Sequence, residues 1–255
     1  MVKPLRTLSR GLEVLRVLNC DDGSTLGLIA KATALSRGSV HRLLETMVSE
    51  GYVRKTEGHY FVERKARALT ASLEVSDWID PETQDAIDEL CRQTLWPISI
   101  LRPNRYCMET WAGTERLTPL RYNLLPIGTK VSMMCSASGR AYMAFNPPTF
   151  QSSMIELLAK EAYFPEDQAA CSDPESAMEM LQSVRSKGAA TAQGTRFKTS
   201  IIAVPILRRE KEVLGSLSMR FFSSSLSISE ALHRNMDKMQ ATAAHIASHL
   251  SDSPH

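Results

Sequence analysis

The residues best suited to chemistry form a short basic stretch directly after Ser36. It combines guanidinium groups with side chains that are small or absent. A helix that enters the major groove of DNA needs short side chains near the bases and guanidinium groups that bond guanine or phosphate. The stretch therefore predicts DNA contacts by Arg37, Gly38, Ser39, His41 and Arg42. His41 ranks lowest, because Glu45 lies four residues further on and can pair with it instead.

These side chains need a helix that presents them on one face, and the surrounding pattern predicts it. Apolar residues recur at helical spacing from Val40 to Val48, Ser36 can cap the start, and Gly51 ends the segment. A second helical pattern covers residues 25–34, which leaves almost no linker between the two. Two helices joined by so tight a turn are typical of a helix-turn-helix.

Two further elements complete the first quarter of the chain. Leu8, Leu12, Leu15 and Leu18 recur at spacings of four, three and three, which predicts a preceding helix with one apolar stripe. After Gly51, two β-rich runs surround a glycine-containing turn and predict a hairpin over residues 52–62. Arg54 and Lys55 lie on this hairpin, which is suited to lie along the phosphate backbone as a wing.

The charge distribution favours DNA as the partner of this region. Residues 1–68 hold 12 Lys or Arg against 7 Asp or Glu, whereas residues 69–255 hold 18 against 21. A basic segment joined to a larger, slightly acidic module is suited to a polyanion. Two alternatives stay open at this point: a three-helix unit with a hairpin can dock a protein, and a basic helix can be a solvated surface.

The remainder of the chain alternates helix and strand patterns. Helices are expected over 81–93, 136–145, 149–160 and 174–187, with hairpins over 98–112 and 201–222. Ser227 and Glu230 form a capping box before a last helix, whose apolar seam runs from Leu232 to Leu250. That seam is expected to pack on a sheet rather than on a partner helix, since it lasts fewer than three heptads.

Catalysis finds little support among these residues. The chain lacks a Walker loop, a dinucleotide glycine fingerprint and a G-x-S-x-G elbow. Cys135, near a helix start, is a nucleophile candidate, but no histidine lies within 70 residues of it in sequence. His245 and His249 are spaced to hold a metal, yet no third ligand is near. We expect no catalytic residue, metal or cofactor, and a cysteine-dependent enzyme remains the alternative.

The overall composition fits an ordinary soluble globular protein. Apolar residues make up 43% of the chain and charged residues 23%, and the formal net charge is +2. The longest apolar run, Ile201 to Leu207, is far short of the roughly 20 residues that a membrane-spanning helix needs. The N-terminal residues are interrupted by Arg or Glu every few positions, unlike a signal peptide. We therefore expect a cytoplasmic protein with no membrane partner.

Two sets of motifs resemble one bacterial family. RGLEVLRVLN and LIAKATALSRGSVHRLLETMVSEGYV are similar to the N-terminal winged helix of IclR-type transcriptional regulators. PIGTKVSMMCSASGRAYMAF and IIAVPILRREKEVLGSLSM resemble the effector-binding domain of the same family. Through TLWP, SASG and IAVP the chain is most similar to activators of aromatic-acid catabolism, of the hydroxyphenylpropionate-regulator type.

The resemblance implies an α+β protein of two domains. A winged helix-turn-helix domain over residues 1–64 would bind operator DNA and place residues 36–50 in the groove. An interdomain helix over 65–79 would lead to a GAF-like α/β effector-binding domain over 80–252, built on a central antiparallel sheet. The implied partners are double-stranded operator DNA, a second copy of the chain in a dimer or tetramer, RNA polymerase, and a small organic acid.

The resemblance also places an effector pocket between the sheet and residues 128–138. Methionines can adapt around an apolar ring, and a helix that starts at Ser136 attracts a carboxylate through its free N–H groups. Many relatives carry an acidic residue where this chain has Arg196, and an arginine there favours an acid effector, although it can equally lie on the surface. An effector that is not an acid is the alternative. The expected pocket residues are Met133, Met134, Cys135, Ser136, Ala137, Arg196, Ser200, Ile202, Ser216 and Ser218.

Overall fold

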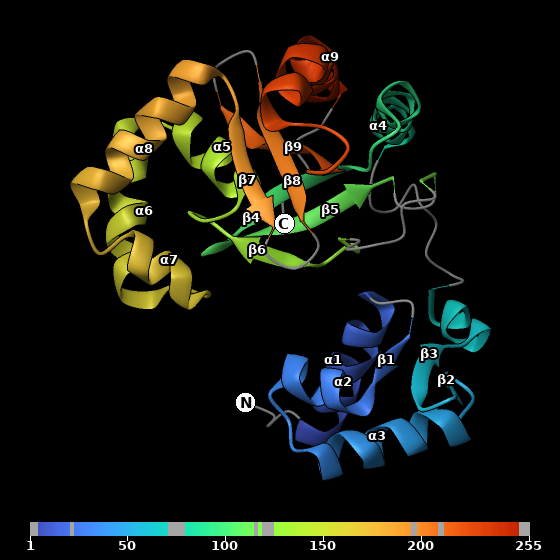
Figure 1. Cartoon of the computed structure of the whole chain (residues 1–255). Helices are drawn as coiled ribbons and strands as arrows, with labels where there is room; N and C mark the ends of the chain where they lie inside the picture. The colour runs from blue at the N-terminus through green and yellow to red at the C-terminus, as the bar shows by residue number, and fades with distance from the viewer. Residues whose placement is uncertain are drawn as a thin grey trace. The chain divides into compact units, whose positions relative to one another are not determined.

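The computed structural model describes most of the chain as two compact units (Figure 1). The described residues are 5–20, 23–70, 80–114, 117–118, 125–194, 198–208 and 212–249, without the side chains of Cys20, Arg67 and Thr70. Of the described residues, those up to Thr70 belong to the first unit and those from Asp80 onward to the second. Each unit has its own apolar core.

The first unit is a winged helix-turn-helix. Its elements, in chain order, are α1 (Arg6–Cys20), β1 (Ser24–Thr25), α2 (Leu26–Thr33), α3 (Arg37–Ser49), β2 (Val53–Thr56) and β3 (His59–Val62). The three strands form an antiparallel sheet in the order β1-β3-β2. The predicted helices and hairpin are therefore confirmed, and β1 is an addition to them. The core consists of Val14, Leu18, Ile29, Ala30, Val40, Leu44, Val53 and Tyr60.

Local capping fixes the tight turn between α2 and α3. The Thr25 hydroxyl accepts the Leu28 N–H at 3.4 Å at the start of α2. Ala34 adopts the left-handed conformation and ends this helix. The Ser36 hydroxyl then accepts the Ser39 N–H at 3.2 Å and starts α3. Only residues 34–36 separate the two helices, as the helix-turn-helix prediction requires.

The apolar stripe expected on α1 is wrong in its first half. Leu8 and Leu12 are 61% and 58% exposed, whereas Gly11, Val14 and Leu18 are buried. The two sets lie side by side on the helix surface, since neighbouring residues are about 100° apart around the axis. A row of leucines lies next to the row of buried residues on α1, so helical spacing alone selects the leucine row instead of the buried row.

The second unit is built on a six-stranded antiparallel sheet. Its strands are β4 (Ile98–Asn104), β5 (Cys107–Gly113), β6 (Lys130–Ser132), β7 (Ala190–Gly194), β8 (Thr199–Leu207) and β9 (Val213–Phe222). Their order in the sheet is β6-β5-β4-β9-β8-β7. The predicted hairpins β4–β5 and β8–β9 are confirmed, whereas β6 and β7 were not predicted.

Helices cover both faces of this sheet. They are α4 (Pro81–Thr94), α5 (Ala137–Phe145), α6 (Pro148–Glu161), α7 (Pro165–Ala170), α8 (Pro174–Lys187) and α9 (Ile228–His249). Helices α4 and α9 pack on one face, and α5, backed by α6 and α8, packs on the other (Figure 1). The last helix therefore packs on the sheet, as its sequence pattern indicates, and only the six-residue α7 was not anticipated.

The helix ends in this unit follow the predicted capping signals. The Ser227 hydroxyl accepts the Glu230 N–H at 3.2 Å, and the Glu230 carboxylate accepts the Ser227 N–H at 3.0 Å. Asp173 caps α8, and Gly188 ends it in the left-handed conformation at φ 74°. These signals lie within four residues of each helix end, so the sequence reveals them directly.

The segment after the wing differs from its prediction. Residues Arg64–Thr70 form a 3-10 helix where the interdomain helix over 65–79 is expected to begin. The rest of the expected interdomain helix, residues 71–79, lies outside the described residues.

Helix α5 packs unusually close to the turn that precedes it. A Cβ atom added at Gly139 would lie 2.1 Å from the backbone carbonyl oxygen of Met133. No side chain can fit at that distance, and a backbone atom cannot rotate away from it. Gly139 therefore fixes how the first turn of α5 meets residues 133–136.

We predict that Gly139→Ala lowers the free energy of unfolding by at least about 1–3 kcal/mol, the usual cost of overpacking a filled site. Urea denaturation of the full chain measures this change. Ser152→Ala, on the exposed side of α6, is the control and should stay within about 0.5 kcal/mol of the parent protein. Equal stability of the parent and the Gly139→Ala variant would contradict the close packing.

Candidate functional site

The outward face of α3 is the first candidate site. Arg37, Gly38, His41 and Arg42 are exposed. Ser39 is half-buried, and its hydroxyl accepts a hydrogen bond from that of Ser36 at 2.9 Å. Within the described part of the chain, the guanidinium groups of Arg37 and Arg42 form no ion pair or hydrogen bond. Guanidinium groups that the protein leaves unsatisfied are available to guanine or phosphate.

Gly38 lies in open space. A Cβ atom built at this position meets no protein atom within 4 Å. Gly38 also lies within α3 and does not adopt a positive φ. The fold itself therefore does not require glycine here, although glycine costs a helix up to about 1 kcal/mol. Close approach of a binding partner to this face of α3 would explain why position 38 is a glycine.

Glu45 links α3 to the wing. Its carboxylate lies 3.6 Å from Lys55 Nζ in β2 and 3.6 Å from His41 Nε2, one turn earlier in α3. A hydrogen bond to Tyr60, and to a smaller degree the charge of Glu45, raises the pKa of Lys55. Lys55 therefore carries a full charge at neutral pH. The contact that the sequence suggested between His41 and Glu45 is present.

The second wing residue, Arg54, is engaged within the hairpin. Its Nε lies 3.1 Å from the Glu63 carboxylate, and its guanidinium lies 4.1 Å from the centre of the Phe61 ring. It also donates to the Thr56 hydroxyl at 3.0 Å. The wing cations thus have partners in the protein, whereas the guanidinium groups of the two α3 arginines have none among the described residues.

A buried carboxylate organises the second candidate site, the turn before α5. Asp167 is fully buried and accepts the N–H groups of Met133 at 2.9 Å and Met134 at 2.7 Å. It also accepts the Ser132 hydroxyl, which in turn accepts the Cys135 N–H. Sequence reasoning missed Asp167, because it lies 35 residues from Ser132 in a helix of six residues and no local pattern marks it.

The first turn of α5 offers unsatisfied donors. The Ser136 hydroxyl accepts the Gly139 N–H at 2.9 Å and donates to the Ser132 carbonyl at 2.6 Å. Ala137 and Ser138 are buried, yet their N–H groups donate to no acceptor in the described ranges. Buried N–H groups without an acceptor are rare in native proteins. At the positive end of a helix they favour an anion.

The facing side of the sheet carries buried hydroxyl groups. Thr110 of β5 and Ser216 of β9 pair with Leu101 of β4 from its two sides, on the face that α5 covers. Neither hydroxyl has a hydrogen-bond partner among the described residues. Ser218 lies on the same face, and its hydroxyl donates to the Ser99 carbonyl at 3.3 Å. Ser216 and Ser218 are thus placed opposite α5 as expected, and Thr110 is an additional polar group that the sequence did not reveal.

Two of the expected pocket residues are not brought to this site. Ser200 and Ile202 point to the opposite face of the sheet, where Ile202 is packed in the core under α4 and α9. The Ser200 hydroxyl lies 2.9 Å from that of Ser223. Successive strand residues alternate between faces, so Ile201 and Ala203 of β8 face α5 instead. The inclusion of Ser200 and Ile202 was wrong for this reason.

Arg140 is a cation of this site that sequence reasoning did not select. It is half-buried, its Nη2 donates to the Thr191 carbonyl at 2.5 Å, and its Nε donates to the Ser136 carbonyl at 3.4 Å. It has no carboxylate partner in the ranges that the structure covers. Burial lowers the pKa of Arg140, yet a guanidinium stays charged in proteins. Arg196, the cation expected here, lies outside the described residues.

The cysteine and histidine candidates have ordinary environments. Burial of the thiol raises the pKa of Cys135, partly offset by a hydrogen bond with Ser132, so the thiol stays protonated at neutral pH. A lowered pKa, which a nucleophile would need, is therefore not found. His249 pairs with Glu82 at 2.5 Å. No group of three metal-binding side chains occurs among the residues with described positions.

Two family models match the chain. The IclR helix-turn-helix domain matches residues 7–57, and the C-terminal domain of bacterial IclR transcriptional regulators matches residues 115–248, more than half of the sequence. The chain belongs to the IclR family. This IclR protein is accordingly a DNA-binding transcriptional regulator, and no described helix is long and apolar enough to cross a membrane.

Curated relatives of this IclR protein are regulators too. It is 26% identical over 236 residues to the "DNA-binding transcriptional repressor YiaJ" of Escherichia coli, covering 87% of this chain and 79% of that one. It is 27% identical over 165 residues to the "Probable transcriptional regulator SauR" of Cupriavidus necator. That match covers 60% of this chain and 62% of SauR, less than two thirds of its length.

Solved structures share the fold of the IclR protein. The IclR transcriptional regulator of Alicyclobacillus acidocaldarius superposes with a TM-score of 0.61 at 20% identity, over 96% of this chain and 99% of that one. An IclR homologue of Microbacterium hydrocarbonoxydans, complexed with 4-hydroxybenzoate, has a TM-score of 0.57 at 18% identity, over 95% and 98%. The predicted fold, a winged helix-turn-helix followed by an α/β domain with an antiparallel sheet, is confirmed.

We predict that Gly38→Ala raises the free energy of unfolding of the IclR protein by up to about 1 kcal/mol but weakens DNA binding. The added methyl group fits the free protein and would meet the DNA, at about 1–3 kcal/mol if the contact is filled. Thermal unfolding and gel shifts measure the two effects. Ser49→Ala, at the far end of α3, is the control that gains helix propensity without a change in affinity. Unchanged DNA affinity in Gly38→Ala would remove this residue from the interface.

Proposed function

We propose that this IclR-family regulator controls a catabolic operon in response to a small organic acid, and that the acid binds between α5 and the sheet. Operator DNA would contact Arg37, Gly38, Ser39, His41 and Arg42 of α3, together with Arg54 and Lys55 of the wing. An operator with two half-sites needs two such units, so the regulator would act as a dimer or a pair of dimers.

The observation that supports an acid most strongly is the set of unsatisfied donors around α5. The N–H groups of Ala137 and Ser138 lack acceptors among the described residues, and Arg140 nearby lacks a carboxylate. A carboxylate would satisfy both kinds of donor, since it accepts several hydrogen bonds and pairs with guanidinium. A neutral effector would leave the positive charge unmatched, which makes it the weaker alternative.

An aromatic acid is the class that fits the apolar part of the site. Met108, Met133, Met134 and Met143 are buried in the cluster under α5. Methionine adapts to flat or irregular groups and makes favourable contacts with aromatic rings. The complex of the Microbacterium homologue with 4-hydroxybenzoate supports the same class. A cysteine-dependent enzyme is disfavoured, because Cys135 has a raised pKa.

The direction of control has two candidates. Similarity of the sequence motifs to activators of aromatic-acid catabolism favours activation, in which bound acid would favour contact with RNA polymerase. The name of the Escherichia coli relative, a repressor, favours the opposite. In either case the acid acts by binding more tightly to one of two states of the regulator, one that binds DNA and one that does not. Its effect on the equilibrium between them cannot exceed the difference in its binding free energy for the two states. Transcription in vitro from the regulator's own upstream DNA, with and without acid, separates the two.

Replacement of Arg42 tests the proposed DNA contact. We predict that Arg42→Ala weakens binding by about 1–3 kcal/mol if the side chain contacts a base. If it contacts only phosphate, the slope of log affinity against log salt should fall by about one. Gel shifts over a salt series measure both quantities. Arg16→Ala, an equal charge change at a residue paired with Glu13, is the control. If neither quantity moves, Arg42 does not touch DNA.

Replacement of Arg140 tests the proposed acid site. We predict that Arg140→Gln weakens the binding of 4-hydroxybenzoate by about 1.5–3 kcal/mol, the usual worth of a hydrogen bond to a charged group. Binding of the neutral 4-hydroxybenzamide should change much less. Calorimetric titration of the full chain measures this, and Lys187→Gln on exposed α8 is the charge-matched control. Equal losses for the acid and the amide would exclude a charge contact by Arg140.

A further inference from the structure

We propose that Glu45 of α3 is a specificity-determining residue, whose carboxylate accepts a hydrogen bond from an exocyclic amino group of a base in the major groove. The inference rests on the proposed contact of α3 with operator DNA, and it adds a residue of opposite charge to the basic contacts. Glu45 is the one acidic residue of α3, whose other side chains are neutral or basic. A negative charge on a surface that binds a polyanion needs an explanation.

Glu45 lies on the face that the proposed DNA contacts share. Gly38, Arg42 and Glu45 follow each other at spacings of four and three residues, which places them on one side of the helix. Val40 and Leu44 are fully buried on the opposite side, whereas 47% of the Glu45 side chain is exposed. Contact of this face with the major groove therefore brings the carboxylate close to the base edges.

Two basic side chains orient the carboxylate without using its capacity to accept hydrogen bonds. His41 Nε2 and Lys55 Nζ both lie nearest to its Oε1 atom, each at 3.6 Å. Lys55 reaches it from the wing, because α3 and β2 contact each other in the first unit (Figure 1). A distance of 3.6 Å is too long for a hydrogen bond. Among the described residues, the Glu45 carboxylate thus has neighbouring charges but no hydrogen-bond donor.

Arg42 does not compete for this carboxylate. It lies three residues before Glu45, a spacing at which an arginine and a glutamate can pair on a helix. The nearest cations of Glu45 are instead His41 and Lys55, and the Arg42 guanidinium is left for DNA. A strong donor and a strong acceptor therefore lie next to each other on the outward face. Such a pair can distinguish base edges, whereas cations alone bind any phosphate.

The chemistry of the major groove selects the partner of this acceptor. The only hydrogen-bond donors on the base edges there are the exocyclic amino groups, N4 of cytosine and N6 of adenine. A carboxylate accepts hydrogen bonds and cannot donate, so guanine N7 and O6, thymine O4 and the phosphates all repel it. Glu45 should therefore favour a half-site with cytosine or adenine at the base that it faces, and disfavour other sequences.

Selection from a randomised duplex DNA library, with and without 4-hydroxybenzoate, tests this proposal together with gel shifts. The wild type should enrich a motif with a position restricted to cytosine or adenine, and Glu45→Ala should lose the preference at that position alone. This variant should bind the wild-type motif at least tenfold more weakly. It should bind random-sequence duplexes at least twofold more tightly, because a negative charge has left the interface. Glu50→Ala, an exposed carboxylate at the end of α3, is the control and should keep the motif.

The opposite signs of these two effects separate the proposal from its alternatives. A change of charge alone would strengthen binding to both kinds of DNA, and a local loss of structure would weaken both. Either result would overturn the proposal. Lys55→Ala removes a wing cation and keeps the carboxylate, so it should weaken both kinds of binding by the same factor and retain the base preference. If Lys55→Ala loses that preference too, Glu45 acts only through the wing, which would also overturn the proposal.

The selected motif distinguishes a failure of this inference from a failure of the proposed DNA contact. If the wild type enriches a motif that Glu45→Ala keeps at every position, only the role of Glu45 is wrong. If the wild type enriches no motif under either condition, the proposed contact of α3 with bases is wrong, and the role of Glu45 with it. The base at the restricted position identifies the donor, since cytosine presents N4 and adenine presents N6.

Discussion

One buried carboxylate determines the arrangement of the effector-binding unit. Asp167 accepts hydrogen bonds from the N–H groups of Met133 and Met134 and from the Ser132 hydroxyl. Removing a carboxylate from water costs several kcal/mol, and only donors in good geometry offset that cost. The turn before α5 is therefore held in one conformation. Gly139 then allows the first turn of α5 to pack directly on the Met133 carbonyl, which leaves two buried N–H groups facing a potential ligand.

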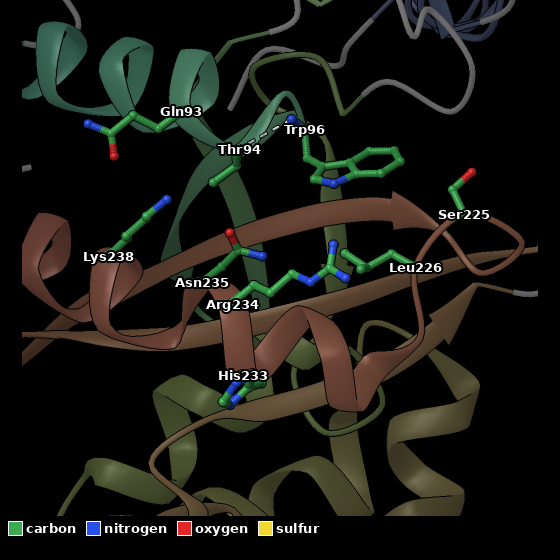
Figure 2. Close-up of a pocket in the computed structure, with 9 residues that line it drawn as sticks. All are labelled: Gln93, Thr94, Trp96, Ser225, Leu226, His233, Arg234, Asn235 and Lys238. Atoms are coloured by element: carbon green, nitrogen blue, oxygen red, sulfur yellow. Dashed lines mark hydrogen bonds between the residues drawn. The ribbon is translucent and has the colours of Figure 1, made fainter.

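The sheet of this unit separates two environments. Strand β9 directs Leu217, Met219 and Phe221 into the apolar core under α4 and α9, and directs Ser216 and Ser218 toward α5. Polar groups without partners gather on the α5 side, where an acid would bind. On the other side the core is apolar, and Arg234 and Lys238 of α9 line a hollow at its edge (Figure 2).

Features that depend on residues close together in the sequence, such as helix caps, were predictable from the sequence. Ser36, Ser136, Asp173 and Ser227 all cap helices as their local patterns indicate, because a cap and its acceptor lie within four residues. Contacts between distant segments were not predictable in this way. Asp167 meets the turn at residues 132–134 only in the folded chain. The face of Ser200 depends on the register of β8 against β9, and flanking leucines obscured which line of α1 is buried.

Hydrogen exchange with and without 4-hydroxybenzoate, in the wild type and in Asp167→Asn, tests the account most directly. The Ala137 and Ser138 amides of the wild type should exchange at least about tenfold more slowly with the acid bound, as expected for new hydrogen bonds to a charged group. In Asp167→Asn the Met133 and Met134 amides should exchange faster, and the acid should no longer protect α5. Equal protection of Ala137 and Ser138 in both proteins, or no protection in either, would contradict the account.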